Sequence, residues 1–122
     1  MSMQPRSAAF LWDLTTASKR IQGFVADKSW DDYNNDLLLR SGVERQFEIA
    51  GEAMNALRRV DPETADRVPN VHKIIGMRNV LIQGYTEVNN LTVWRAATEN
   101  LDEVVTTVDA LLDEAGRPDL TT

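Results

Sequence analysis

Residues 78–85 contain side chains that could bind and act on a phosphate group. In this segment Arg78 is followed directly by Asn79, and Gln83 stands two residues before Tyr85. The planar guanidinium of Arg78 stays charged and can donate two parallel hydrogen bonds to phosphate oxygens. The amide of Gln83 can donate and accept hydrogen bonds, but it cannot carry a proton through a reaction. Taken alone, Arg78 would more often be a surface or salt-bridging residue; as a functional group, it would bind phosphate in a site without a general acid or base at position 83.

Helical geometry decides which of these side chains can face a common ligand. Residues seven apart return to the same side of an α-helix, so Arg78 and Tyr85 are expected to share a face. Residues five apart do not, and Arg78 and Gln83 would diverge by about 140°. Gly84 could loosen the final turn and redirect its neighbour. One copy of this helix is therefore not expected to bring Arg78 and Gln83 together.

Composition limits the kinds of site that the chain can build. We predict a single domain over residues 1–122, with a helical core at about 8–115 and short flexible tails. The absence of cysteine excludes disulfides, thiolate metal sites and cysteine nucleophiles, and a single histidine, His72, argues against a histidine-rich metal site. A net charge of −6 argues against bulk attraction to nucleic acid, although a few well-placed cations could still form a local site.

The chain also lacks sequence features that would place it outside the cytoplasm. The amino terminus has no positively charged start followed by an apolar run, so no signal peptide is predicted. No stretch reaches the roughly 20 apolar residues that a membrane span requires. We therefore expect a cytoplasmic protein that does not enter a membrane.

Apolar residues recur at helical spacing along most of the chain, and no alternating strand pattern of useful length is present. A first helix is expected to run to about Val25, and a second, capped by Ser29, to carry the apolar stripe from Leu39 to Leu57. Gly51 lies in this stripe, where a close helix approach or a slight bend is expected. The pattern predicts an all-α protein, an up-and-down bundle of four main helices with a short extra helix.

The remaining helix boundaries follow from proline, glycine and capping residues. Asp61, with a proline after it, predicts the start of the short extra helix. Asn70 is expected to cap the helix that leads into Arg78. One continuous last helix is predicted to begin near Asn89 or Asn90, and Gly116 and Pro118 are expected to end it.

Several segments together resemble HEPN-domain ribonucleases of the HepT toxin type. That family has Arg, four residues, His, one residue and Tyr where this chain has residues 78–85. The Gly-Glu-Ala step at 51–53, the run Ile-Ile-Gly-Met at 74–77 and the pair Val-Trp at 93–94 also match the family's elements in order and spacing. The resemblance covers roughly residues 8–112.

The resemblance implies a metal-independent RNA endonuclease that needs no cofactor. Its RNA-cleaving site would be assembled across the two-fold axis of a homodimer from Arg78, Asn79 and the position that Gln83 occupies. The family also implies a cognate partner, a minimal nucleotidyltransferase that serves as the antitoxin and adenylylates the motif tyrosine, here Tyr85. The protein would thus be the toxin of a toxin–antitoxin pair.

Gln83 departs from the family at the position of its histidine. General acid–base catalysis commonly contributes roughly 10²–10⁴-fold, so a chain with Gln83 is expected to be inactive or impaired. Either this is a naturally degenerate member or its histidine has been replaced; the second is favoured because an active toxin is hard to express. A rescue by His72, six residues before Arg78, is not expected. The alternative function is a non-catalytic helical partner, the substrate-binding companion of a minimal nucleotidyltransferase.

Trp30 and Tyr33 could be read in two ways. Aromatic side chains at the start of a helix often pack as a hydrophobic staple, and exposed ones can stack on nucleic-acid bases. The staple is favoured because both residues lie within four residues of the expected cap at Ser29.

Overall fold

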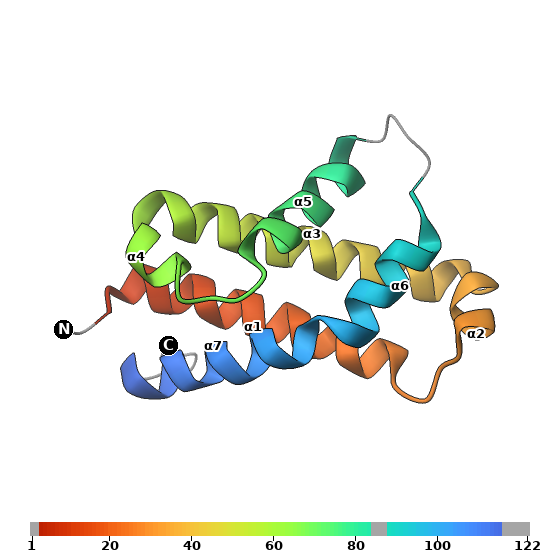
Figure 1. Ribbon diagram of the computed structural model, residues 1–122, viewed down its shortest axis with the longest axis horizontal. Coiled ribbons are helices and arrows are strands. Elements are labelled where there is room, and N and C mark those ends of the chain that lie inside the picture. Colours follow the sequence, from red (N-terminus) through yellow and green to blue (C-terminus); the bar gives the residue numbers. More distant parts are fainter. Residues whose placement is uncertain (1–2, 84–87, 116–122) are drawn as a thin grey trace.

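The structure, a computed structural model, describes residues 3–83 and 88–115, and within them the regular elements are all helices. In chain order they are α1 (Pro5–Val25), α2 (Trp30–Asn34), α3 (Leu37–Val60), α4 (Pro62–Ala65), α5 (Val71–Gln83), α6 (Asn90–Glu99) and α7 (Leu101–Ala115). Figure 1 shows these helices side by side in one elongated bundle. The predicted all-α fold is confirmed.

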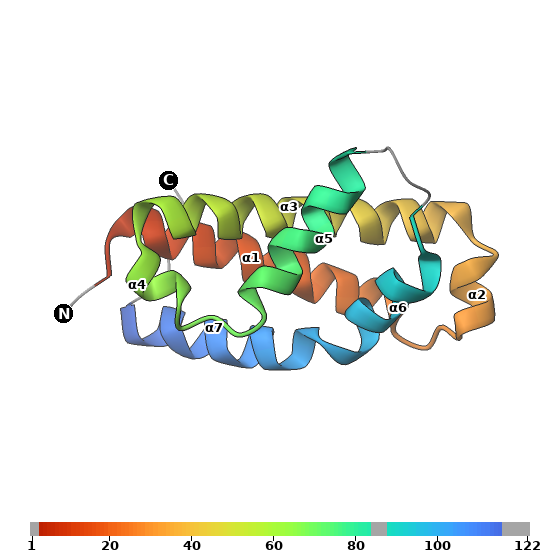
Figure 2. The ribbon, with the colours of Figure 1, turned by 45° about the horizontal axis from the view of Figure 1, so that its top comes forward.

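Consecutive long segments of the bundle run in alternating directions (Figure 1). α1 and α3 pack along most of their lengths, and α7 covers the other side of α1. α5 lies on α3 but crosses it obliquely, so its carboxyl-terminal turns rise away from the rest of the bundle (Figure 2). The last residues of α5 therefore project from the body of the protein.

The apolar stripes of the helices fill two regions of core. In the larger one, α1, α3, α5 and α7 meet around Leu14, Met54, Leu57 and Val104, all of which are fully buried. The smaller one lies between α1, α2, α3 and α6 and includes Tyr33. Burial of these side chains is the main driving force that holds the helices together.

Two predicted helix caps are present in the structure. Ser29 and Asp32 form a reciprocal capping box, in which each side chain accepts a hydrogen bond from the other's backbone N–H, at 3.1 and 2.9 Å. Asp61 accepts a hydrogen bond from the backbone N–H of Thr64 at 3.1 Å and starts α4. Its second oxygen accepts a 2.7 Å hydrogen bond from the hydroxyl of Ser7, which fastens α1 to the end of α3.

The helix capped by Ser29 is shorter than predicted. It ends as α2 at Asn34, and a second cap, Asp36, accepts a hydrogen bond from the N–H of Leu39 and begins α3. A run of Asn and Asp residues between the two helices favours this break, because their side chains bond to nearby backbone in non-helical conformations. The prediction of one helix from Ser29 to Leu57 was wrong at this point.

The predicted continuous last helix is divided at Asn100. α6 ends there and α7 begins at Leu101, whose side chain is buried. Asn70 stands at the start of α5 as predicted, because its carbonyl oxygen accepts a 3.0 Å hydrogen bond from the N–H of Ile74, while its Nδ2 lies 3.5 Å from the carbonyl oxygen of Asn100. Asn70 has a φ of 62°, a left-handed conformation that asparagine tolerates better than most residues. The predicted stop at Gly116 and Pro118 lies outside the described residues.

No helix in the described ranges combines the length and the apolar character that crossing a membrane would require.

Candidate active site

The motif helix contacts the bundle at Gly51. A side-chain carbon at this position of α3 would collide with Cβ of Arg78, would lie 2.7 Å from its Cγ and would be 3.2 Å from the carbonyl oxygen of Ile74. Only a glycine allows α5 to approach α3 so closely without displacement. The close helix approach expected at this glycine is therefore present, and it sets the position of Arg78.

Arg78 is half-buried at this crossing, and its charge is not neutralised by any carboxylate among the described residues. One terminal nitrogen donates a 3.1 Å hydrogen bond to Oδ1 of Asn79, while Nε is buried without a hydrogen-bond partner among the described residues. Within residues 3–83 and 88–115, no ion pair involves Arg78. A guanidinium with free N–H donors and no carboxylate partner is suited to bind an anion such as phosphate.

Gln83 is the last residue of α5, and its side chain is exposed. Because the helix continues to this residue, the ideal separation of about 140° between the directions of Gln83 and Arg78 applies. Arg78 lies against α3, whereas Gln83 is on the part of α5 that projects from the bundle (Figure 1). A single protomer thus does not direct both groups at one atom.

Tyr85 and Gly84 lie outside the described residues. The expected shared face of Arg78 and Tyr85 therefore stays a prediction.

The order and spacing of the motif elements agree with a comparison of the whole chain against known families. The sequence model of the family described as Ribonuclease HepT-like matches residues 14–111. The chain belongs to the HepT-like ribonuclease family. The matched range includes the α3–α5 crossing and the described part of the motif.

Curated relatives of this HepT-like chain come from an archaeon and a bacterium. In Methanocaldococcus jannaschii, "Putative RNase MJ1380" is 28% identical over 98 residues, covering 79% of this chain and 87% of that protein. "Putative RNase MJ0125" of the same organism is 29% identical, with 79% and 82% covered. "Putative RNase TTE0752" of Caldanaerobacter subterraneus is 30% identical over 96 residues, with 79% and 81% covered. No solved structure matches the chain significantly.

A groove runs beside the motif of the HepT-like chain, and the sequence did not predict it. It has a volume of about 690 Å³ and lies between α5 and α6, with Phe47 of α3 in its lining. Its wall on α5 includes Met77 and Val80, and two cations, Lys73 and Arg95, also line it. The one indication of this groove in the sequence was the apolar residue Val80. In the structure its side chain remains 45% exposed, although its helix packs on the bundle.

His72 lies far from position 83 within one protomer. It is exposed in the first turn of α5, as expected. It is on nearly the same side of the helix as Gln83, but eleven residues of rise separate the two by about 16 Å. A proton carrier at that distance is far outside the hydrogen-bonding reach that general acid–base catalysis requires.

The aromatic residues near Ser29 belong to the core of the HepT-like fold. Tyr33 has no exposed surface, and burial raises the pKa of its hydroxyl above the usual value. Its ring stacks on Trp30 at a centroid distance of 6.3 Å and meets Trp94 at 5.3 Å. Tyr33 therefore cannot stack on a nucleic-acid base, which supports the packing interpretation.

Proposed function

We propose that this member of the HepT-like ribonuclease family is the toxin of a toxin–antitoxin pair. Its activity is that of a metal-independent RNA endonuclease, impaired in this chain because Gln83 occupies the position of the proton-transferring histidine. Its partner is a minimal nucleotidyltransferase that acts as the antitoxin. The observation that carries the proposal is the half-buried guanidinium of Arg78, which pairs with the amide of Asn79 and with no carboxylate in the described part of the chain.

Arg78 supplies the cation that an RNA phosphate requires during cleavage. Attack by the 2′-hydroxyl builds negative charge on the phosphate oxygens, and a guanidinium stabilises that charge through bidentate hydrogen bonds. The Gly51 contact holds the base of the Arg78 side chain against α3, so few of its conformations remain to be lost when RNA binds. Asn79 accepts a hydrogen bond from Arg78 and orients it without cancelling its charge.

Gln83 leaves the proton-transfer steps of this reaction without a carrier. The 2′-hydroxyl must lose a proton as it attacks, and the leaving 5′-oxygen must gain one. Histidine performs such transfers because it titrates near neutral pH, whereas an amide does not titrate in this range. The chain is therefore expected to bind RNA and to cleave it poorly.

A second copy of the chain completes the site. Arg78 and Gln83 point apart on one α5, so a two-fold axis near the projecting end of this helix is required to bring one copy's Arg78 towards the other's residue 83. Val80 and Ile82 in this projecting end are 45% and 47% exposed, and they provide apolar area for such an interface.

Replacing Gln83 tests the proposed chemistry. Gln83→His should produce cleavage of single-stranded RNA in the presence of EDTA, together with growth inhibition on expression. Gln83→Asn is the matched control, because it changes the side chain at the same exposed position without adding a titratable group. Adding Arg78→Ala to Gln83→His should remove the gained activity.

The outcome also separates the two candidate functions. If the unaltered chain cleaves RNA in EDTA as fast as the Gln83→His variant, the role proposed for position 83 is wrong. If neither protein cleaves RNA but the chain still binds a nucleotidyltransferase, the chain acts as that enzyme's non-catalytic helical companion. The exposed amide at position 83 is the observation that favours this second function.

A further inference from the structure

The face of α3 that receives Arg78 continues towards the end of the helix as a polar stripe. Gly51, Asn55 and Arg58 are spaced four and three residues apart, which places them within about 60° of one another around the helix. Gly51 is the position on which α5 rests. Arg58 therefore lies on the same side of the bundle as the Arg78 contact, two turns further along α3.

Arg58 has the same kind of polar partner as Arg78. Its Nη2 donates a 3.2 Å hydrogen bond to Oδ1 of Asn55, an uncharged amide. Arg45 and Arg67, in contrast, form ion pairs with glutamates at 3.2 and 2.9 Å. No ion pair involves Arg58 within the ranges that the structure describes.

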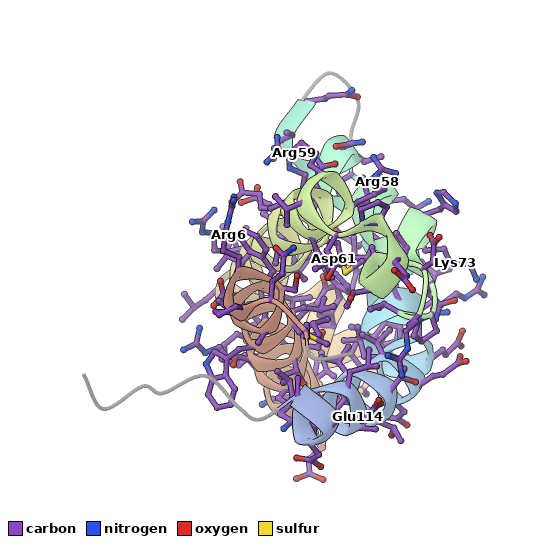
Figure 3. All side chains as sticks on the ribbon, turned by 90° about the vertical axis from the view of Figure 1, so that its left-hand side faces the viewer. Arg6, Arg58, Arg59, Asp61, Lys73 and Glu114 are labelled. Carbon is purple, nitrogen blue, oxygen red and sulfur yellow. The ribbon has the colours of Figure 1, made fainter. Side chains whose placement is uncertain are left out.

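The spacing along α3 between Arg58 and the contact with Arg78 suits a nucleic-acid backbone. Seven residues of helical rise separate Arg58 from Gly51 by about 10 Å along α3. Phosphates follow one another at about 3.4 Å along the axis of a stacked strand, so this span corresponds to about three phosphate steps. Figure 3 looks at the end of the bundle where α3 terminates and shows Arg58 and Arg59 on the side over which α5 rises.

We propose that Arg58, positioned by Asn55, binds a second phosphate of the RNA strand whose scissile phosphate is held by Arg78. This assignment rests on the proposed ribonuclease function and extends it by one binding subsite. In a chain with a net charge of −6, RNA cannot be held by general attraction, so contacts with individual cations must provide the affinity. Arg78 and Arg58 lie on one side of the bundle and form no ion pair with a described residue, so they meet that requirement.

A simpler role for Arg58 is to stabilise the end of its own helix. Arg58 and Arg59 are both basic residues in the last turn of α3, where a cation interacts favourably with the helix dipole. Arg59 is exposed as well, but it is turned by about 100° from Arg58 and lies on nearly the same side of the helix as Glu52. Arg59 is thus a matched control, because it carries the same charge at the same helix end and also lies on the α5 side of the bundle (Figure 3), but it is outside the stripe of Gly51, Asn55 and Arg58.

The test measures RNA binding as a function of salt. Fluorescence anisotropy of a short labelled single-stranded RNA in EDTA would be followed between about 50 and 200 mM salt. Arg58→Ala should weaken binding about tenfold, as for loss of a charge-assisted hydrogen bond. It should also reduce the slope of log affinity against log salt by about 0.7, the value for one phosphate on a single strand. Asn55→Ala should weaken binding less and leave the slope unchanged, because the charge remains.

The controls decide between a phosphate contact and a general effect of charge. Arg59→Ala should leave the slope close to that of the unaltered chain, and Arg58→Gln should repeat the loss seen with Arg58→Ala. An equal loss of slope in Arg59→Ala, or an unchanged slope in both Arg58 variants, overturns the subsite. A thermal unfolding transition like that of the unaltered chain, recorded by circular dichroism, shows that each variant is folded.

Failure of this subsite can be told apart from failure of the proposed function. If Arg78→Ala weakens RNA binding and the Arg58 variants do not, only the second subsite is wrong. If the unaltered chain does not bind RNA, or if Arg78→Ala has no effect on binding, the ribonuclease site and its extension are both wrong.

Discussion

Arg78 of α5 lies directly against Gly51 of α3. A residue in the middle of α3 therefore determines where the guanidinium of Arg78 is placed. The contact involves Cβ and Cγ of the arginine, and Cβ cannot move away without moving α5 itself. The proposed phosphate-binding group is therefore built into the helix packing of the protein.

Gly51→Ala should displace α5 and destabilise the fold. Overpacking commonly costs about 1–3 kcal/mol, and the better helix propensity of alanine returns about 1 kcal/mol. The free energy of unfolding in urea should therefore fall by up to about 2 kcal/mol, the range left by these two effects. Gly23→Ala in α1 is the control, since a Cβ there has nothing within 4 Å and should increase stability. A Gly51→Ala protein as stable as the Gly23→Ala protein would contradict the close contact.

Asp61 should make stability depend on pH in the acidic range. Hydrogen bonds from the side chain of Thr64, from the hydroxyl of Ser7 and from the backbone of Thr64 lower the pKa of its carboxyl. Because the pKa is lower in the folded than in the unfolded protein, the stabilisation is complete above the unfolded pKa. It is lost as the pH falls through the folded pKa.

Asp61→Ala measures this contribution. The substitution should lower the free energy of unfolding at neutral pH by about 1 kcal/mol, a typical value for loss of an N-cap. The difference between the two proteins should shrink as the pH is lowered below about 4, where the aspartate of the unfolded chain becomes protonated. A difference that stays constant between pH 7 and the acid transition would show that ionisation of Asp61 does not contribute.

A charge at the projecting end of α5 should dissociate the expected homodimer. Val80→Glu would place an unpaired carboxylate in the apolar area proposed for the interface, and burial of such a charge is unfavourable. Sedimentation should show a dimer for the unaltered chain at micromolar concentration and a monomer for this variant. Leu38→Glu is the control, because Leu38 is 84% exposed at the start of α3, away from this end of α5. A monomeric unaltered chain would exclude the two-fold site.

Tyr85 should be the residue that the cognate nucleotidyltransferase modifies. Incubation with that enzyme and ATP should increase the mass of the chain by one AMP group, which adds a bulky anion near the cation intended for RNA. The increase should be absent in Tyr85→Phe and present in Tyr33→Phe, since the hydroxyl of Tyr33 is buried. Persistence of the mass increase in Tyr85→Phe would place the modification elsewhere.

The sequence alone determined the features that depend on neighbours along the chain. The caps at Ser29 and Asp61 form between residues three apart, so their residue types are sufficient to predict them. The divergence of Arg78 and Gln83 follows from helix geometry once the segment is known to be helical. The motif's order and spacing also indicated the family, which the family comparison then confirmed.

Only the tertiary structure decided the features that depend on residues distant in sequence. The break at Asn100, the groove between α5 and α6, and the contact of Arg78 with Gly51 all result from how separate helices pack. Periodicity shows which face of a helix is buried, but it does not show which residue of another helix it meets. Arg58 illustrates the difference. In the sequence it is one of two adjacent arginines, and only the crossing of α5 over Gly51 shows that it continues the stripe of α3 that Arg78 contacts.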